Sequence, residues 1–134
     1  MAASLMAADS SWLTSLPDAK ARAEKEKKLL FLDFTGSDWC GWCKKLDAEV
    51  FSTPEFAQYA AKNLVLVQLD FPAQKPQSDD LKAANKALAK KFEITGYPTL
   101  IVMKPDGSVL WKQVGFMRGG TTAWIAKLDA AKAK

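Results

Sequence analysis

The chain has 134 residues, which suits one domain, and its 49% hydrophobic and 25% charged residues are ordinary for a globular protein. The 19 basic and 15 acidic residues give a net charge of +4, and the chain contains no histidine. The composition excludes disordered tails and disulfide-stapled miniproteins. The lack of histidine excludes Ser-His-Asp triads, Cys-His protease pairs and His-ligated zinc sites within the chain.

The N-terminal segment bears on whether the protein is exported, and the charge pattern bears on whether it binds nucleic acid. Residues 1–10 lack the charged start and long apolar run of an intact secretory signal, and we interpret them as a flexible N-terminus or the remnant of such a signal. No apolar run approaches the length of a membrane span. The densest basic cluster is Lys25, Lys27 and Lys28, and its interleaving with Glu24 and Glu26 favours a solvated helix face over a nucleic-acid site.

The first predicted elements are a helix and a central strand. Residues 10–28 are predicted to be helical, with Pro17 ending a first piece and Asp18 capping a second piece at residues 19–28. The apolar run at residues 29–34 suits a strand that is covered on both faces.

Two helices and a second strand are predicted next. Cys43, Leu46 and Val50 recur at helical spacing, which places Cys40 at the N-terminus of a helix. Thr53 is expected to cap the following helix, which has a proline in its first turn. The strand after it has the apolar sequence Leu64-Val65-Leu66-Val67-Gln68-Leu69-Asp70.

The second half is predicted to contain a loop at residues 71–77, a helix starting at 78–80, strands at 99–103 and 108–115, and a last helix after residue 118. The apolar stripe of the first of these helices is Leu81, Ala84, Leu88, Ala89 and Phe92. Inward residues of the last helix are Trp124, Ile125 and Leu128, and Trp111 is also assigned to the core. The early strands, separated by helices, are expected to pair in parallel and the closing hairpin in antiparallel fashion. The predicted fold class is therefore α/β, with a mixed central sheet and helices on both faces.

The two cysteines carry the clearest chemistry. Side chains at positions i and i+3 of a first helical turn project to the same side, so Cys40 and Cys43 lie within disulfide range. The helix N-terminus lowers the pKa of the Cys40 thiol, and the thiolate is the nucleophile of disulfide exchange. Cys40 is therefore expected to attack a substrate disulfide, and Cys43, further into the helix and more buried, to resolve the mixed disulfide.

Other uses of a Cys-x-x-Cys pair are less favoured. A closed zinc site needs two more ligands, and the chain has no third cysteine and no histidine. A purely structural disulfide gains little from closing so short a loop. A metal or cluster bridged between two chains stays open as an alternative. We expect no metal site and no cofactor besides the redox-active disulfide.

Asp33 interrupts an otherwise apolar strand. If buried, its carboxyl is expected to be unpaired with a raised pKa, and it can then take the proton of Cys43 during resolution. The alternative is an acid at the strand end that caps the turn at Thr35.

Pro98 follows an aromatic residue and directly precedes a strand. A cis peptide bond there exposes the backbone N–H and C=O of Tyr97 for pairing with an extended substrate segment. The alternative is an ordinary trans proline in a loop.

Taken together, these motifs resemble the thioredoxin superfamily over residues 25 to 131. The matching stretches are Leu32-Asp33-Phe34, Trp39-Cys40-Gly41-Trp42-Cys43-Lys44, Gly96-Tyr97-Pro98-Thr99-Leu100, and Lys104-Pro105-Asp106-Gly107 leading to Val114-Gly115. The extended pattern at residues 36–51 looks most like exported bacterial thioredoxin-like proteins.

The resemblance implies a thioredoxin-like fold for the whole chain, residues 1–134, and a thiol–disulfide oxidoreductase that reduces or isomerises protein disulfides. It implies an attacking Cys40, a resolving Cys43, a buried acid at Asp33 and a cis-proline at Pro98. The implied substrate groove contains Trp39, Gly41, Trp42, Tyr97, Pro98, Gly115 and Phe116. Implied partners are protein thiol or disulfide substrates and a redox partner protein, for a monomer exported to the bacterial periplasm. Alternatives are a cytoplasmic location and a non-catalytic, redox-switched binding module.

The sequence also departs from the family pattern. Gly-Trp lies between the cysteines, and the segment from Asp33 to Cys40 is one residue longer than in ordinary thioredoxin. Residues 71–85 resemble an insertion. Gln68 stands where thioredoxins often carry a lysine near the acid, which implies a different tuning of Asp33.

Overall fold

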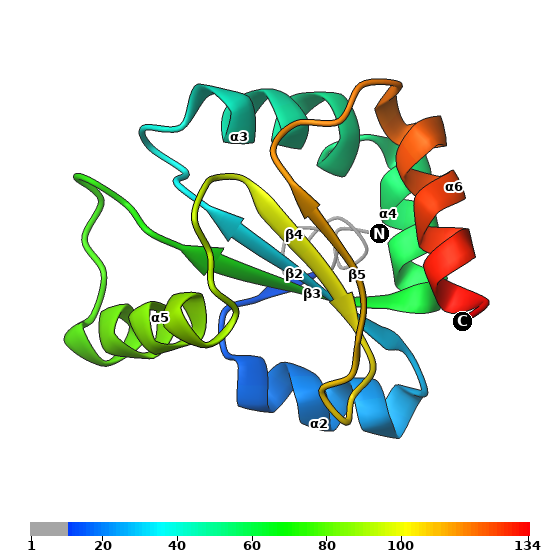
Figure 1. The fold of residues 1–134 in the computed structure, drawn as a ribbon, viewed down its shortest axis with the longest axis horizontal. Helices are drawn as coiled ribbons and strands as arrows, with labels where there is room; N and C mark the ends of the chain where they lie inside the picture. Colours follow the sequence, from blue (N-terminus) through cyan, green and yellow to red (C-terminus); the bar gives the residue numbers. More distant parts are fainter. Residues whose placement is uncertain (1–10) are drawn as a thin grey trace, which may run out of the picture.

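The computed structural model describes residues 11–134, which form a five-stranded mixed sheet with helices on both faces (Figure 1). The strands are β1 (Trp12–Leu13), β2 (Leu29–Thr35), β3 (Leu64–Asp70), β4 (Thr99–Met103) and β5 (Val109–Val114). The helices are α2 (Leu16–Glu26), α3 (Gly41–Leu46), the π-helix η1 (Asp47–Phe51), α4 (Pro54–Asn63), α5 (Asp79–Lys91) and α6 (Gly120–Lys132). The sheet order is β1-β3-β2-β4-β5. β1 and β2 each pair with β3 in parallel, and β4 pairs in antiparallel fashion with both β2 and β5, which confirms the predicted mixed sheet.

The N-terminal region corrects one prediction. Residues Trp12–Leu13 form an edge strand that pairs with β3, and they are not helical. The helix α2 begins at Leu16, and the hydroxyl of Ser15 caps it by accepting a hydrogen bond from the N–H of Asp18. Pro17 therefore lies in the first helical turn, where its missing N–H costs nothing, so it neither ends a helix nor makes Asp18 the cap.

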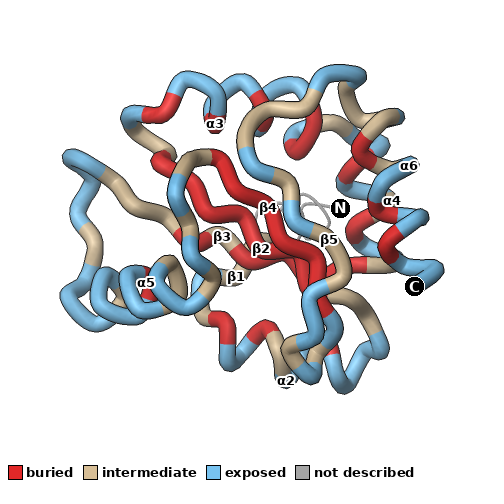
Figure 2. The backbone as a smooth tube through the Cα atoms, in the orientation of Figure 1, coloured by how far each residue is buried: buried red, intermediate tan, exposed pale blue. Residues whose placement is uncertain are grey.

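The central strand β2 is covered on both faces. Leu30, Leu32 and Phe34 are fully buried in the cluster that contains the α2 side chains, whereas Phe31 is buried in the cluster of α3, η1, α4 and α6. Because side chains alternate along a strand, Asp33 shares the face of Phe31, which is the face that α3 covers. Figure 2 shows the resulting buried centre of the sheet, with exposed segments around it.

Helix α5 is less buried than its predicted apolar stripe suggests. The helix starts where it was predicted to, with Ser78 as its cap, but Ala84 is exposed and its neighbour Asn85 is buried instead. The Asn85 amide donates a hydrogen bond to the backbone carbonyl of Asp70 at 3.1 Å, which satisfies the buried polar group. Only one short stretch of α5 is therefore drawn as buried in Figure 2.

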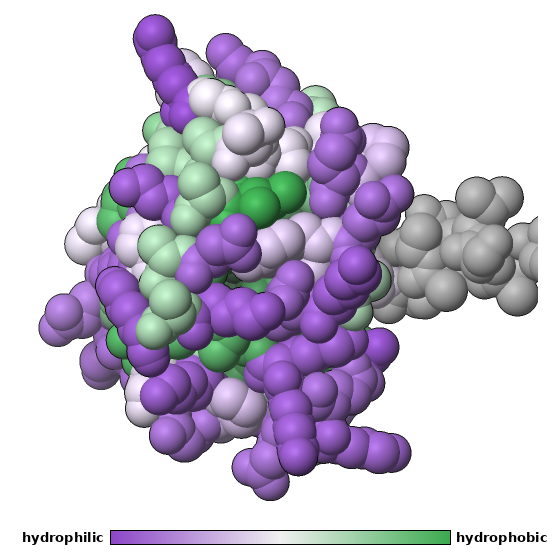
Figure 3. All heavy atoms as spheres, turned by 90° about the vertical axis from the view of Figure 1, so that its right-hand side faces the viewer, coloured by the Kyte–Doolittle hydropathy of each residue, from purple (hydrophilic) through white to green (hydrophobic). Residues whose placement is uncertain are grey.

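The C-terminal half contains the predicted strands and helix, but two of its predicted core residues, Trp111 and Ile125, are only partly buried. Trp124 of α6 is fully buried, and its ring packs 5.3 Å from the ring of Trp111 on β5, which is half-buried. Ile125 is also only partly buried, whereas Leu128 is buried. Hydrophilic side chains cover most of the face seen in Figure 3, with hydrophobic patches between them. Within residues 11–134, no helix is long and apolar enough to cross a membrane.

Candidate active site

The two cysteines lie at the start of α3 and form a disulfide. Cys40 is the N-cap of the helix and Cys43 lies in its first turn, with their Cα atoms 5.2 Å apart. The backbone N–H of Cys43 donates to Sγ of Cys40 at 3.2 Å. The Cys40 sulfur therefore occupies the position where a helix N-terminus favours negative charge.

The exposure of the two cysteines differs from expectation. Cys40 is 6% exposed and Cys43 is 5% exposed, so greater burial of Cys43 is not found. Both residues are held in the tight turn at the helix start, which buries them equally. Their position along α3 is what distinguishes them, because only Cys40 accepts the N-terminal backbone hydrogen bond.

Asp33 is a buried acid beneath α3. It is 7% exposed, and its Oδ1 has no hydrogen-bond partner among the described residues, so it does not cap the turn at Thr35. Burial raises the pKa of the Asp33 carboxyl to about 8, and the nearby negative charges of Asp47 and Asp70 add to this effect. The carboxyl can therefore gain and lose a proton near neutral pH. Gln68, its partner on β3, brings no positive charge to the site.

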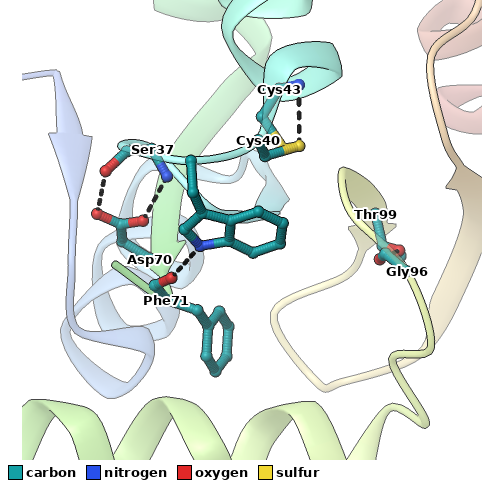
Figure 4. The surroundings of a disulfide bond; sticks show 8 residues. Ser37, Cys40, Cys43, Asp70, Phe71, Gly96 and Thr99 are labelled. Carbon is teal, nitrogen blue, oxygen red and sulfur yellow. Dashed lines mark hydrogen bonds between the residues drawn. A yellow bond between two sulfur atoms is a disulfide. The ribbon is translucent and has the colours of Figure 1, made fainter. Parts of the chain in front are cut away.

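The turn that leads into β4, residues 96–98, contains the predicted cis-proline. The Tyr97–Pro98 peptide bond is cis, and the hydroxyl of Thr99 donates to the carbonyl of Gly96 at 2.6 Å. Figure 4 shows this turn on the side of the disulfide opposite to Ser37 and Asp70. The ring of Tyr97 packs against the ring of Trp39, with centroids 5.7 Å apart.

The segment before Cys40 is bound to the loop that follows β3. The carboxylate of Asp38 accepts hydrogen bonds from the backbone N–H groups of Ala73, Gln74 and Lys75, at 2.8, 2.8 and 2.9 Å. These three bonds lower the pKa of Asp38 to about 2. The sequence showed two separate departures from the family pattern: the longer segment between Asp33 and Cys40, and the insertion at residues 71–85. These hydrogen bonds show that the two segments contact each other.

Two further contacts join the same segments. The carboxylate of Asp70 accepts hydrogen bonds from the backbone N–H and the hydroxyl of Ser37, at 2.9 and 2.5 Å (Figure 4). The indole Nε1 of Trp39 donates to the carbonyl of Phe71 at 2.7 Å. Nothing in the sequence pattern predicts these bonds, because their partners lie more than thirty residues apart.

A cleft of about 650 Å³ opens beside the active-site helix, and we name it the Trp42 cleft. Its lining residues are Trp42, Lys45, Glu49, Tyr97, Gly115, Phe116, Arg118 and Gly119. The structure thus brings together four of the predicted groove residues, namely Trp42, Tyr97, Gly115 and Phe116. Trp39, Gly41 and Pro98 do not line it, although the Trp39 ring contacts Tyr97.

Sequence reasoning missed the charged residues of this cleft. Lys45, Glu49 and Arg118 line it, but Arg118 is far from the cysteines in sequence. The sequence did contain a signal for two of them: Lys45 and Glu49 follow Trp42 by three and seven residues, which is the spacing of side chains on one face of a helix. Trp42 is 57% exposed and Trp39 is 49% exposed, so two large aromatic surfaces flank the disulfide.

A metal site is not found in the part of the chain that the structure describes. No group of three or more histidine, cysteine or acidic side chains gathers there in a way that suits a metal ion.

Comparisons with known proteins agree with this geometry. The family model described as "Thioredoxin-like domain" matches residues 16–131. The chain is 32% identical over 127 residues to the "Disulfide bond reductase DsbH" of Chlamydia pneumoniae, covering 95% of this chain and 75% of that protein. It is 29% identical over 109 residues to the "Thiol:disulfide interchange protein DsbD" of Haemophilus influenzae, covering 79% of this chain but only 17% of DsbD.

Solved structures give the same picture. A DsbH oxidoreductase superimposes with a TM-score of 0.83 at 31% identity, covering 89% of this chain and 82% of that chain. The C-terminal domain of DsbD from Neisseria meningitidis superimposes with a TM-score of 0.67 at 23% identity, covering 90% of this chain and 98% of that one, and shows the shared fold.

Proposed function

This chain belongs to the thioredoxin-like family of thiol–disulfide oxidoreductases, and from that premise we propose that its Cys40–Cys43 pair reduces disulfide bonds in other proteins. The observation that carries the proposal is the disulfide at the start of α3, flanked by two exposed tryptophans and the Trp42 cleft. The name of the DsbH relative, a disulfide bond reductase, favours the reducing direction.

The proposed reaction has two exchange steps. The thiolate of Cys40 attacks one sulfur of a substrate disulfide, forming a mixed disulfide and releasing the other substrate sulfur as a thiolate. Cys43 loses its proton and attacks Sγ of Cys40, which closes the Cys40–Cys43 disulfide and releases the second substrate sulfur. The substrate gains two electrons, and this chain loses two.

Asp33 is proposed to accept the Cys43 proton in the second step. The side chain lies on the face of β2 that α3 covers, and its raised pKa allows proton exchange near neutral pH. Cys40 keeps the hydrogen bond from the backbone N–H of Cys43, which stabilises a negative charge on its sulfur.

Partners and location follow from the same proposal. A redox partner protein must return two electrons to the disulfide after each cycle, and no metal or cofactor is needed for the exchange itself. We propose a periplasmic location because residues 36–51 resemble exported bacterial proteins and the DsbH and DsbD relatives are bacterial. We also propose that the protein works as a monomer.

The direct test is reduction of insulin disulfides by the reduced protein. We expect turnover with a chemical reductant present and complete loss in Cys40→Ser. A titration against glutathione then gives the direction, since a potential near −270 mV marks a reductant and one near −120 mV an oxidant. Absence of turnover with insulin and with every other protein disulfide tried would contradict the proposal.

A further inference from the structure

The Trp42 cleft borders the helical turn that carries the reactive disulfide, because its lining residue Trp42 directly precedes Cys43 in the chain. Trp42 sits between the two cysteines in sequence, and its ring packs against Phe116 with centroids 5.4 Å apart. Tyr97, whose backbone is proposed to pair with the substrate, lines the same cleft. We therefore expect a chain segment whose cysteine is joined to Cys40 to pass over or next to this cleft.

The cleft carries an excess of positive charge. The ammonium group of Lys45 lies 5.4 Å from the ring centre of Trp42 and 5.1 Å from that of Phe116, so the two aromatic rings hold it at the cleft wall. Arg118 is exposed and makes none of the ion pairs found within residues 11–134. Among the eight lining residues, Glu49 is the one acid.

Glu49 does not cancel the charge of Lys45. Their charged atoms are 3.9 Å apart, and both side chains are about half exposed, at 48% and 49%. An exposed pair at this distance is weak, because water screens it and both side chains lose rotamer freedom. Lys45 and Arg118 therefore stay available to a negatively charged group that enters from solvent.

Building on the proposed function, we propose that the Trp42 cleft selects protein substrates that carry an acidic side chain close to the reactive cysteine, in an extended segment. The carboxylate lies between Lys45 and Arg118, and the apolar atoms of its neighbours pack on Trp42 and Phe116. Successive side chains of an extended segment point in opposite directions, so the preference applies at particular spacings from the cysteine. We assign the cleft to a protein segment because it borders the turn that carries Cys40, and the substrate cysteine becomes bonded to the sulfur of Cys40.

The test uses short unstructured peptides with one cysteine, blocked as a mixed disulfide with neutral β-mercaptoethanol. Glutamate or lysine is placed in turn at each of three positions on either side of the cysteine. The rate of disulfide reduction by the fully reduced protein is followed by chromatography. At low salt we expect the best glutamate peptide to react about 5-fold faster than its lysine counterpart, and less than about 2-fold faster at 0.5 M salt.

Two double variants locate the effect. Lys45→Gln with Arg118→Gln is expected to remove the preference, so that glutamate and lysine peptides are reduced at equal rates. The matched control, Lys44→Gln with Lys127→Gln, loses the same net charge from exposed lysines outside the cleft lining and is expected to keep the preference.

Each outcome separates the two proposals. Equal rates for glutamate and lysine peptides, or an equal loss of preference in the control variant, would overturn the selection of acidic segments and leave the oxidoreductase function standing. No reduction of any peptide, with or without charge, would count against the oxidoreductase function itself.

Discussion

The indole Nε1 of Trp39 donates a hydrogen bond to the backbone carbonyl of Phe71 at 2.7 Å, so the residue before the reactive cysteine is fixed by the loop that follows β3. The same loop is held by the carboxylate of Asp38. One wall of the active site thus depends on contacts between two segments that are distant in sequence. Two of the predictions below test this dependence.

Gly36 leaves room for the indole of Trp39. A Cβ at residue 36 would overlap the indole ring atoms of Trp39. Gly36→Ala is therefore expected to displace the ring, break its bond to Phe71 and lower the free energy of unfolding by about 1–3 kcal/mol. Urea denaturation and tryptophan emission check this. In the control Gly41→Ala, a Cβ meets nothing within 4 Å, and no comparable loss is expected.

Asp38 holds the loop of residues 71–78. Asp38→Ala removes the acceptor of three backbone hydrogen bonds, so we expect faster proteinase K cleavage within this loop and altered tryptophan emission. Asp106→Ala is the matched control, because that carboxylate bonds only to Ser108 within its own turn. Equal cleavage in both variants would show that Asp38 does not hold the loop.

Part of the fold and of the active site could be predicted from the sequence, at positions where neighbouring residues alone determine the element. The apolar run of β2, the Thr53 cap with Pro54, and the spacing of Cys40 and Cys43 each identify an element without knowledge of the rest of the fold. The apolar run left the burial of Asp33 open, and the family resemblance implied it; the residue is buried in the structure.

The features that the sequence did not predict depend on contacts between residues far apart in the chain. The strand at Trp12–Leu13 is too short to show any periodicity and exists because β3 offers it a partner. Asn85 is buried in place of the apolar Ala84 because the carbonyl of Asp70 accepts its hydrogen bond. The charge of the Trp42 cleft depends on Arg118, which only the folded chain brings beside Lys45.

Asp33 is expected to make stability depend on pH. Its pKa is about 8 in the folded protein, against an ordinary value of 3.8. Between these values the folded state keeps a proton that the unfolded state has lost, so stability falls as pH rises from about 4 to about 8 and levels off beyond.

Asp33→Asn removes this dependence. In the oxidised protein, where the cysteines do not titrate, we expect the variant to be more stable than the parent at pH 8, by on the order of a few kcal/mol. Urea denaturation at pH 5 and pH 8 measures it, with Glu24→Gln as an exposed control. A parent protein that is equally stable at both pH values would contradict the raised pKa.

The same variant tests proton transfer. With Asp33→Asn we expect slower resolution of the mixed disulfide near neutral pH, because the proposed acceptor of the Cys43 proton is removed. Rapid-quench analysis of the mixed disulfide over a range of pH measures this step. An unchanged pH profile would return Asp33 to a purely structural role.

The division of labour between the cysteines has its own test. Cys43→Ser is expected to accumulate a mixed disulfide between Cys40 and the substrate, since the resolving thiol is absent. Non-reducing gels and mass spectrometry detect the adduct, and Cys40→Ser is the control that should form little of it. If the adduct formed equally in both variants, the assigned roles would be wrong.

The central place of β2 has a consequence for how the molecule opens. Its backbone is paired with β3 on one side and β4 on the other, and residues 30–35 are buried. Amide hydrogens of such a strand exchange with solvent only when the whole sheet comes apart, whereas the mostly exposed α5 and the loop before it can open on their own. We therefore expect Asp33 to keep its position when α5 and the loop before it open locally. These openings change the surface around Trp39, where a substrate docks, but they do not move the buried carboxyl beneath α3.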